Sequence, residues 1–186
     1  MKSRISSVVT RHGDRGKTSL ADGERYNKFD PSIELVGVLD EANAALGLAS
    51  VLIQSPWLEE LRRVQSRLFD VGAAVALSAV QTGWDQELSH LEAIVEKMNS
   101  PLEPLKEFVL PGSNEISARL HVARTIARRS ERLFWKAANE QLRSSTIGAY
   151  LNRVSDYLFV LSRVLSDEEV LWEPMMDHNS SPSSAT

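Results

Sequence analysis

The sequence predicts an all-α protein, an antiparallel bundle of five helices with a glycine-rich, non-helical segment at its N-terminus. Three observations lead to this fold class. Apolar residues recur at three- and four-residue intervals over several long stretches, the pattern of a helix with one buried face. Two of these stretches begin with a cap residue followed by proline, a typical helix start. No convincing pair of strand patterns is found.

The first thirty residues differ from the rest of the chain. Residues 10–23 contain three glycines and almost no apolar residues. This composition favours tight turns and exposed backbone amides over helix. On composition alone, a flexible solvated arm and a ligand-binding loop are equally good interpretations.

The first three helices follow between residues 30 and 98. Asp30-Pro31 is a cap followed by proline and begins a first helix of about six turns. Ser55-Pro56 repeats this signal at the start of a second helix, which runs toward residue 78. A third, shorter helix follows Gly83 and covers roughly residues 85–98. The apolar positions expected on the buried faces of the first two helices are Leu35, Val38, Leu39, Ala42, Leu46, Ala49, Leu58, Leu61, Val64, Leu68, Val71 and Val75.

A proline-rich loop precedes the last two helices. Residues 99–112 contain three prolines, which exclude a regular helix. Ser113 is expected to cap the fourth helix, with Glu115 in the first turn, where the helix dipole favours an anion. The fifth helix covers roughly residues 144–166. The buried positions expected in these two helices are Leu120, Ala123, Ala127, Ser130, Phe134, Ala137, Ile147, Leu151, Val154, Leu158 and Leu161.

We expect a single domain over residues 1–176. It comprises the N-terminal segment 1–30 and a helical bundle over residues 31–166, and residues 177–186 form a serine-rich, disordered tail. A chain of 186 residues is long enough for one domain with a sizeable core.

Composition excludes several classes of protein. Hydrophobic residues make up 42% of the chain and charged residues 25%, which is ordinary for a soluble globular protein. The formal net charge of −4 argues against a general binder of nucleic acid or of a membrane surface. The absence of cysteine excludes disulfides and thiolate metal sites. Because the chain has neither a signal-peptide pattern nor a run of about 18 apolar residues, the expected location is the cytoplasm.

The N-terminal segment contains a candidate phosphate-binding loop. Gly13-Asp-Arg-Gly16-Lys17-Thr18 resembles a Walker A loop, but only two residues separate its glycines where that motif has four. Successive backbone amides in such a loop still form a concave site for an anion. Lys17 and Lys28 would add positive charge, and Thr18 and Ser19 offer hydroxyl groups to a phosphate or its metal.

The fourth helix carries a row of arginines. Arg124, Arg128 and Arg132 are spaced four residues apart and share one face, flanked by Arg129 and Glu131. Like charges at this spacing repel one another, so an anionic ligand or carboxylate partners would stabilise the row. A guanidinium binds phosphate or carboxylate bidentately. For a generic helix, a solvated face is the more common explanation.

Two apolar helices are interrupted by polar groups. Asp40-Glu41-Ala-Asn43 lies in the first helix, and Asn152-Arg153 with Ser155-Asp156 lies in the last. Carboxylates in such surroundings usually pair with arginines, here those of residues 124–132. A purely structural ion pair is at least as good an interpretation as a catalytic role.

The histidines predict no metal centre. His12, His90, His121 and His178 are scattered along the chain. The Glu-x-x-His spacing of Glu87 and His90 occurs once, whereas a di-iron bundle needs it twice.

Together these segments resemble the PduO-type cob(I)alamin adenosyltransferases. The similarity extends from Thr10 to about Arg163, and five motifs in order with compatible spacing are highly specific. The motifs are Thr10-Arg-His-Gly-Asp-Arg-Gly-Lys-Thr-Ser19, Val38-Leu-Asp-Glu-Ala-Asn43, Phe108-Val-Leu-Pro-Gly112, Ala123-Arg-Thr-Ile-Ala-Arg-Arg-Ser-Glu-Arg132 and Leu151-Asn-Arg-Val-Ser-Asp-Tyr-Leu-Phe159.

The resemblance implies a homotrimer of five-helix bundles with active sites between adjacent subunits. It implies that the cobalt(I) of reduced cobalamin attacks the ribose 5′-carbon of ATP and expels tripolyphosphate. Mg²⁺ is expected on the ATP phosphates without a direct protein cage, and a reductase is expected as the electron-donating partner. Because cobalt supplies the nucleophile, no activated Ser, Cys or Lys is required.

The resemblance also implies roles for individual residues. Arg128, Asp40 and Phe108 would be catalytic, with Asp40 paired to Arg128 across the subunit interface. Phe108, the cobalamin-binding residue, would press on the lower face of the corrin, keep out the nucleotide-tail ligand and favour four-coordinate cobalt. The residues expected to bind ATP are Thr10, Arg11, His12, Gly13, Asp14, Gly16, Lys17, Thr18, Ser19, Lys28, Arg128, Arg129, Ser130, Glu131, Arg132 and Asn152.

Three positions depart from the commonest family pattern. His12 replaces a small polar residue, Ser113 a second glycine, and Ser130 an alanine. The alternative function is a non-catalytic cobalamin carrier or a nucleotide-binding regulator on the same bundle. Retention of both the glycine-rich loop and the arginine row argues against it, because a carrier needs no triphosphate site.

Overall fold

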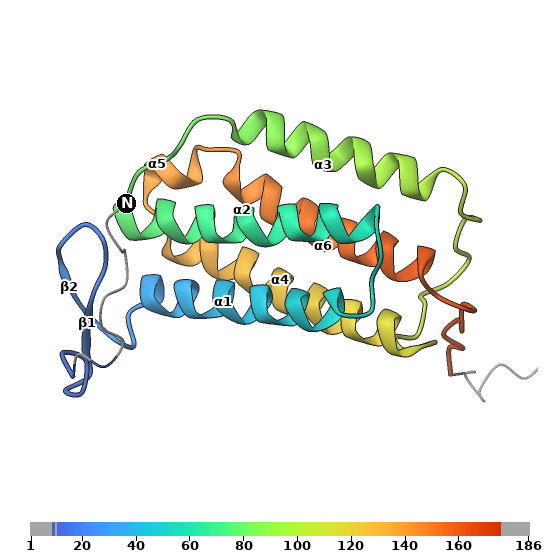
Figure 1. Cartoon of the computed structure of the whole chain (residues 1–186), viewed down its shortest axis with the longest axis horizontal. Coiled ribbons are helices and arrows are strands. Elements are labelled where there is room, and N and C mark those ends of the chain that lie inside the picture. The colour runs from blue at the N-terminus through green and yellow to red at the C-terminus, as the bar shows by residue number, and fades with distance from the viewer. Residues whose placement is uncertain (1–8, 10, 176–186) are drawn as a thin grey trace, which may run out of the picture.

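The computed structural model describes Val9 and residues 11–175, and over these residues the chain is a helical bundle with a small hairpin at one end (Figure 1). The strands are β1, Lys17–Ser19, and β2, Arg25–Asn27. The helices are α1, Pro31–Ser50; α2, Trp57–Leu77; α3, Trp84–Asn99; α4, Glu115–Ala137; α5, Glu140–Arg143; and α6, Ile147–Val164. The five long helices match the prediction, and α5 adds a single turn.

The helices pack side by side with their apolar faces turned inward. α1 packs against both α2 and α4, and α6 packs against both α4 and α3. The apolar positions predicted for α1 are all buried, and so are those predicted for α6. Leu58 of α2 and Ala137 of α4 are only partly buried, because each lies near one end of its helix. None of the helices in the described part of the chain is long and apolar enough to cross a membrane.

The expectation that no strands pair is wrong for the N-terminal segment. β1 and β2 form an antiparallel pair in which Lys17 faces Asn27 and Ser19 faces Arg25. Each strand has only three residues, so a two-residue alternation is too short to detect in the sequence.

The predicted cap of α4 is displaced by one residue. Asn114, not Ser113, is the N-cap, and its side chain accepts a hydrogen bond of 2.8 Å from the Ser117 amide. The same side chain donates to the Leu165 carbonyl at 2.8 Å, so this one amide group also joins α4 to the end of α6. Ser113 instead contacts the Ser166 hydroxyl. The prediction of Glu115 in the first turn is confirmed.

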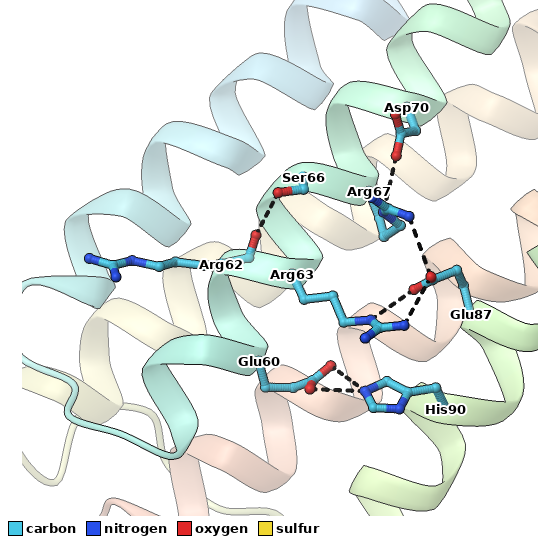
Figure 2. Close-up of polar contacts among 8 residues, drawn as sticks. All are labelled: Glu60, Arg62, Arg63, Ser66, Arg67, Asp70, Glu87 and His90. Carbon is cyan, nitrogen blue, oxygen red and sulfur yellow. Dashed lines mark hydrogen bonds and ion pairs between the residues drawn. The ribbon is translucent and has the colours of Figure 1, made fainter.

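Charged side chains join α2 to α3, as Figure 2 shows. Arg63 donates from two nitrogens to the Glu87 carboxylate at 3.0 Å each, and Arg67 reaches the same carboxylate at 3.3 Å. His90 lies 2.9 Å from a Glu60 oxygen. Glu87 and His90, the single Glu-x-x-His pair, therefore hold α3 against α2.

We expect the substitution Glu87→Gln to destabilise the bundle. The Glu87 side chain is 17% exposed and pairs with two arginines, whereas that of Arg63 is 43% exposed and therefore partly screened. A loss of about 1 kcal/mol lowers the melting temperature of a chain of this size by about 2–4 °C. Calorimetry should detect this shift. Glu96→Gln is the matched control, since Glu96 is an exposed carboxylate on the same helix. Equal melting temperatures of the two variants would contradict the role given to the Glu87 carboxylate.

Candidate functional site

The glycine-rich segment folds into a turn that a lysine covers. A side chain at Gly13 would place its Cβ 3.1 Å from the Lys28 Nζ, so the end of the lysine side chain lies close over this glycine. The Lys28 amide donates to the Gly16 carbonyl at 2.9 Å. The structure thus brings Gly13, Gly16 and Lys28 together, as a phosphate-binding turn requires. Thr10 lies outside the described residues.

The other predicted residues of this segment surround the turn. Arg11, His12, Asp14, Lys17 and Ser19 are exposed, and Thr18 is partly buried in β1. Lys17 lies opposite Asn27 on the hairpin, and Asn27 directly precedes Lys28 in the sequence. Cationic side chains therefore occur together on one short, solvent-accessible element.

Two residues that the sequence reasoning missed hold this hairpin in place. The Asp22 amide donates to the Ala76 carbonyl at the end of α2, at 3.0 Å. The Tyr26 hydroxyl donates to the Asp22 carboxylate at 2.5 Å, and the Glu24 amide adds a bond of 3.0 Å. These bonds lower the pKa of Asp22, and the carboxylate raises the pKa of Tyr26. The Asp22-Gly23 turn signal was the only indication in the sequence.

The arginine row of α4 lines a hollow on the bundle surface, which we call the basic hollow. Its walls are Arg124, Thr125, Arg128, Glu131 and Arg132. Within the described residues, neither the Arg128 nor the Arg132 side chain has a hydrogen-bond or ion-pair partner. These two guanidinium groups are therefore available to an anion from outside the chain.

Arg124, the third member of the row, is already held by its neighbours. Its Nε donates to His121 Nδ1 at 3.3 Å, and its guanidinium lies 5.9 Å from the centre of the Phe159 ring. Burial, and then the charge of Arg128, lower the pKa of Arg124. His121 is buried, and burial together with Arg124 lowers its pKa as well. His121 is therefore neutral and donates from Nε2 to the Ser162 hydroxyl, 3.2 Å away.

Two predicted ATP-binding residues of α4 point elsewhere. Arg129 forms an ion pair with Glu41 of α1, as expected for a carboxylate of that helix. Ser130 is fully buried, and its hydroxyl contacts the carbonyls of Val38 and Ile126. Neither side chain lines the basic hollow.

A second hollow is lined by two of the predicted residues, one of which also lines the first hollow. Glu131 of α4 and Asn152 of α6 both line it, so the fold brings these two residues together. Trp135 donates from its indole nitrogen to the Glu131 carboxylate at 2.6 Å. A Cβ on Gly148 would lie only 2.4 Å from this ring, so glycine is required beneath it. Trp135 was missed, although Gly148 inside a helical pattern is a recognised signal of close packing.

Aromatic side chains form a third, apolar hollow next to the basic one. Phe108 and Phe159 line it together with Leu105, Lys106 and Glu107. Phe108 is 78% exposed, and its ring centre lies 6.2 Å from that of Trp172, another residue that the sequence reasoning missed. Because Arg124 lies over Phe159, this ring connects the apolar hollow to the arginine row.

Asp40 lies apart from these three hollows. It is exposed on α1 and lines a groove between α1 and α2, together with Gly37, Phe69 and Gly72. Among the described residues Asp40 has no ion-pair partner, and it forms no ion pair with Arg128 of its own chain.

Known proteins resemble this chain in sequence and in fold. The sequence model of the family described as Cobalamin adenosyltransferase matches residues 8–165. The Corrinoid adenosyltransferase of Mycobacterium tuberculosis (strain ATCC 25618 / H37Rv) is 38% identical over 193 residues, covering 97% of this chain and 100% of that protein. The Corrinoid adenosyltransferase PduO of Salmonella typhimurium is 40% identical over 164 residues, covering 84% of this chain and 49% of that protein.

A solved structure has the same architecture. It is a variant PduO-type ATP:corrinoid adenosyltransferase from Lactobacillus reuteri complexed with cobalamin and ATP. The TM-score is 0.81 at 27% identity, and the match covers 90% of this chain and 100% of that chain.

Proposed function

The chain belongs to the cobalamin adenosyltransferase family, and on this basis we propose that it transfers the 5′-deoxyadenosyl group of ATP to cob(I)alamin, forming adenosylcobalamin. The observation that carries the proposal is the adjacency of two surfaces. An arginine row that includes two unpaired guanidinium groups meets an aromatic hollow, where Arg124 of the row lies over the Phe159 ring that lines the hollow. One surface suits a triphosphate and the other an apolar macrocycle.

The reaction needs charge stabilisation and positioning rather than a protein nucleophile. The electron pair of cobalt(I) forms the bond to the ribose 5′-carbon, while the carbon–oxygen bond breaks and tripolyphosphate leaves. Negative charge therefore grows on the departing group. Arg128 and Arg132 would bind this group, together with Lys17, Lys28 and the backbone amides near Gly13.

Two positions in the solved relatives support Phe108 and Arg128. The Lactobacillus reuteri structures carry substitutions at a phenylalanine and at an arginine twenty residues further along. In this chain Phe108 and Arg128 have the same separation. We propose that Phe108 contacts the lower face of the corrin, keeps the nucleotide-tail ligand away and so favours four-coordinate cobalt.

We propose that the ATP site spans two subunits of a homotrimer. The hairpin is anchored to the end of α2, and within the described residues no hydrogen bond or ion pair joins residues 11–28 to Arg128 or Arg132. A neighbouring subunit can bring the two halves together. The exposed Asp40 would then pair with Arg128 of the partner subunit, which explains a carboxylate without a partner in a mostly apolar groove.

We propose that Mg²⁺ enters with ATP. The described residues contain no group of three or more His, Cys, Asp or Glu side chains placed to hold a metal ion. The hydroxyls of Thr18 and Ser19 lie on β1 beside Lys17, and hard oxygen donors of this kind suit Mg²⁺. When bound, Mg²⁺ would neutralise phosphate charge. We further propose that residues 1–176 act as one domain in the cytoplasm and that a reductase supplies cob(I)alamin.

The proposal is tested by incubating the purified protein with ATP, Mg²⁺ and chemically reduced cobalamin. Formation of the cobalt–carbon bond changes the visible spectrum, and exposure to light, which cleaves this bond to give cob(II)alamin, should change it again. Tripolyphosphate should appear in equal amount. Binding of both ligands without any spectral change under strict reduction would favour the carrier instead. Light scattering on the same sample measures the oligomeric state.

A further inference from the structure

The segment after α6 forms a strap over the loop that carries Phe108. We use the name C-terminal strap for residues 168–172. Leu171 pairs with Val109 in an isolated antiparallel bridge. The Leu110 amide donates to the Val170 carbonyl at 2.8 Å, and the Trp172 amide donates to the Phe108 carbonyl at 2.7 Å. The backbone of Phe108 is thus bonded directly to the C-terminal strap.

Phe108 has little other support. Its ring is 78% exposed, and the aromatic contact found for it among the described residues is with Trp172 of the C-terminal strap. The preceding loop, residues 100–107, contains two prolines and no regular helix. The position of Phe108 therefore depends on the position of the C-terminal strap.

An ion pair ties the C-terminal strap to the bundle. The Arg163 side chain, on the last turn of α6, is only 6% exposed. Its Nε donates to one Glu169 oxygen at 2.5 Å and its Nη2 to the other at 3.2 Å, while Nη2 also donates to the Glu103 carbonyl at 2.7 Å. Because a buried guanidinium stays charged, the carboxylate is held firmly. One guanidinium thus joins α6, the proline-rich loop and the C-terminal strap.

We propose that Arg163 and Glu169 are positioning residues for the reaction: through the C-terminal strap they set the place of Phe108 beneath the corrin. Neither side chain lines the apolar hollow or the basic one. Their effect is limited to the step that needs Phe108, which is exclusion of the nucleotide tail from cobalt. This inference rests on the proposed function of the apolar hollow.

The inference predicts selectivity between two corrinoid substrates. Cobalamin carries the nucleotide tail that Phe108 must exclude, whereas cobinamide lacks it. In Glu169→Gln, we expect the adenosylation rate with cobalamin to fall about 10- to 100-fold. A loss of this size is expected when a positioned group, here the Phe108 ring, is displaced by about 1 Å. The rate with cobinamide should stay within about twofold of the parent enzyme, and the KM for ATP should be unchanged. Glu168→Gln, an exposed neighbour, is the matched control and should behave as the parent.

The outcomes separate this inference from the proposed function. Equal losses with both corrinoids would assign Glu169 a merely structural role and overturn the inference. Unchanged rates with both would also overturn it. A parent enzyme inactive with both corrinoids would instead refute the proposed function. Arg163→Lys keeps the charge but loses the planar fork, so an intermediate, cobalamin-selective loss is expected for it.

Discussion

Replacing Arg128 with alanine is expected to lower kcat/KM for ATP about 100- to 1,000-fold, the range seen when one preorganised charge-stabilising group is removed. Its guanidinium lines the basic hollow and has no partner within the described residues. If Arg128 also pairs with Asp40 of the partner subunit, the same substitution leaves that carboxylate unpaired at the interface. Steady-state kinetics and light scattering measure the two effects separately.

The controls distinguish a specific contact from general positive charge. Lys136→Ala removes another cation of α4, in the last turn and away from the basic hollow, and should leave kcat/KM unchanged. Arg128→Lys keeps the charge without the bidentate fork and should lose less than the alanine variant. Arg124→Ala tests the alternative that Asp40 of the partner subunit pairs with Arg124. This arginine precedes Arg128 in the row, and its side chain donates to His121. Normal activity and normal assembly of Arg128→Ala would refute the role given to this residue.

The fold was predictable wherever its signals are local. The recurrence of Leu35, Leu39 and Leu46 locates the buried face of α1 because neighbouring turns of one helix determine it. The predicted cap of α4 was wrong by one residue, because the Asn114 side chain makes two hydrogen bonds, one to the Ser117 amide and one to the Leu165 carbonyl. One of these reaches Leu165 at the far end of α6, and sequence spacing carries no information about it.

The site was predictable in its residue types but only partly in its geometry. Helical spacing places Arg124, Arg128 and Arg132 on one face, and all three line the same hollow. The same spacing cannot say that Arg129 turns to Glu41, because that depends on how α1 packs on α4. Ser130, an expected ATP ligand, is buried for the same reason.

The aromatic residues show most clearly what sequence spacing omits. Trp172 follows the last predicted helix and belongs to no motif, yet it lies beside Phe108. Trp135 contacts Glu131 one turn away, but its position depends on the absence of a side chain at Gly148. Contacts across the fold, rather than along one helix, decide where these rings lie.

Replacing Phe108 with alanine is expected to lower the rate of cobalamin adenosylation about 100-fold, equivalent to about 2.7 kcal/mol of activation free energy. Without the ring, the nucleotide tail can return to cobalt, and the four-coordinate state becomes harder to reach. Electron paramagnetic resonance of bound cob(II)alamin should therefore show the five-coordinate signal in place of the four-coordinate one. Affinity for ATP should not change, because Phe108 lies outside the basic hollow.

The matched control for Phe108 is Leu110→Ala, which removes another exposed apolar side chain beside the same Val109–Leu171 bridge. Its rate with cobalamin should equal that of the parent, and so should its four-coordinate signal. If Phe108→Ala kept the four-coordinate signal and lost activity with cobinamide as well, the ring would act on binding of the corrin as a whole. The exclusion of the tail would then have to come from another group, and Trp172, whose ring lies 6.2 Å from Phe108, is the nearest aromatic candidate in the described structure. The double variant Phe108→Ala with Trp172→Ala tests this directly: if the rings act together, its loss with cobalamin is smaller than the product of the single losses.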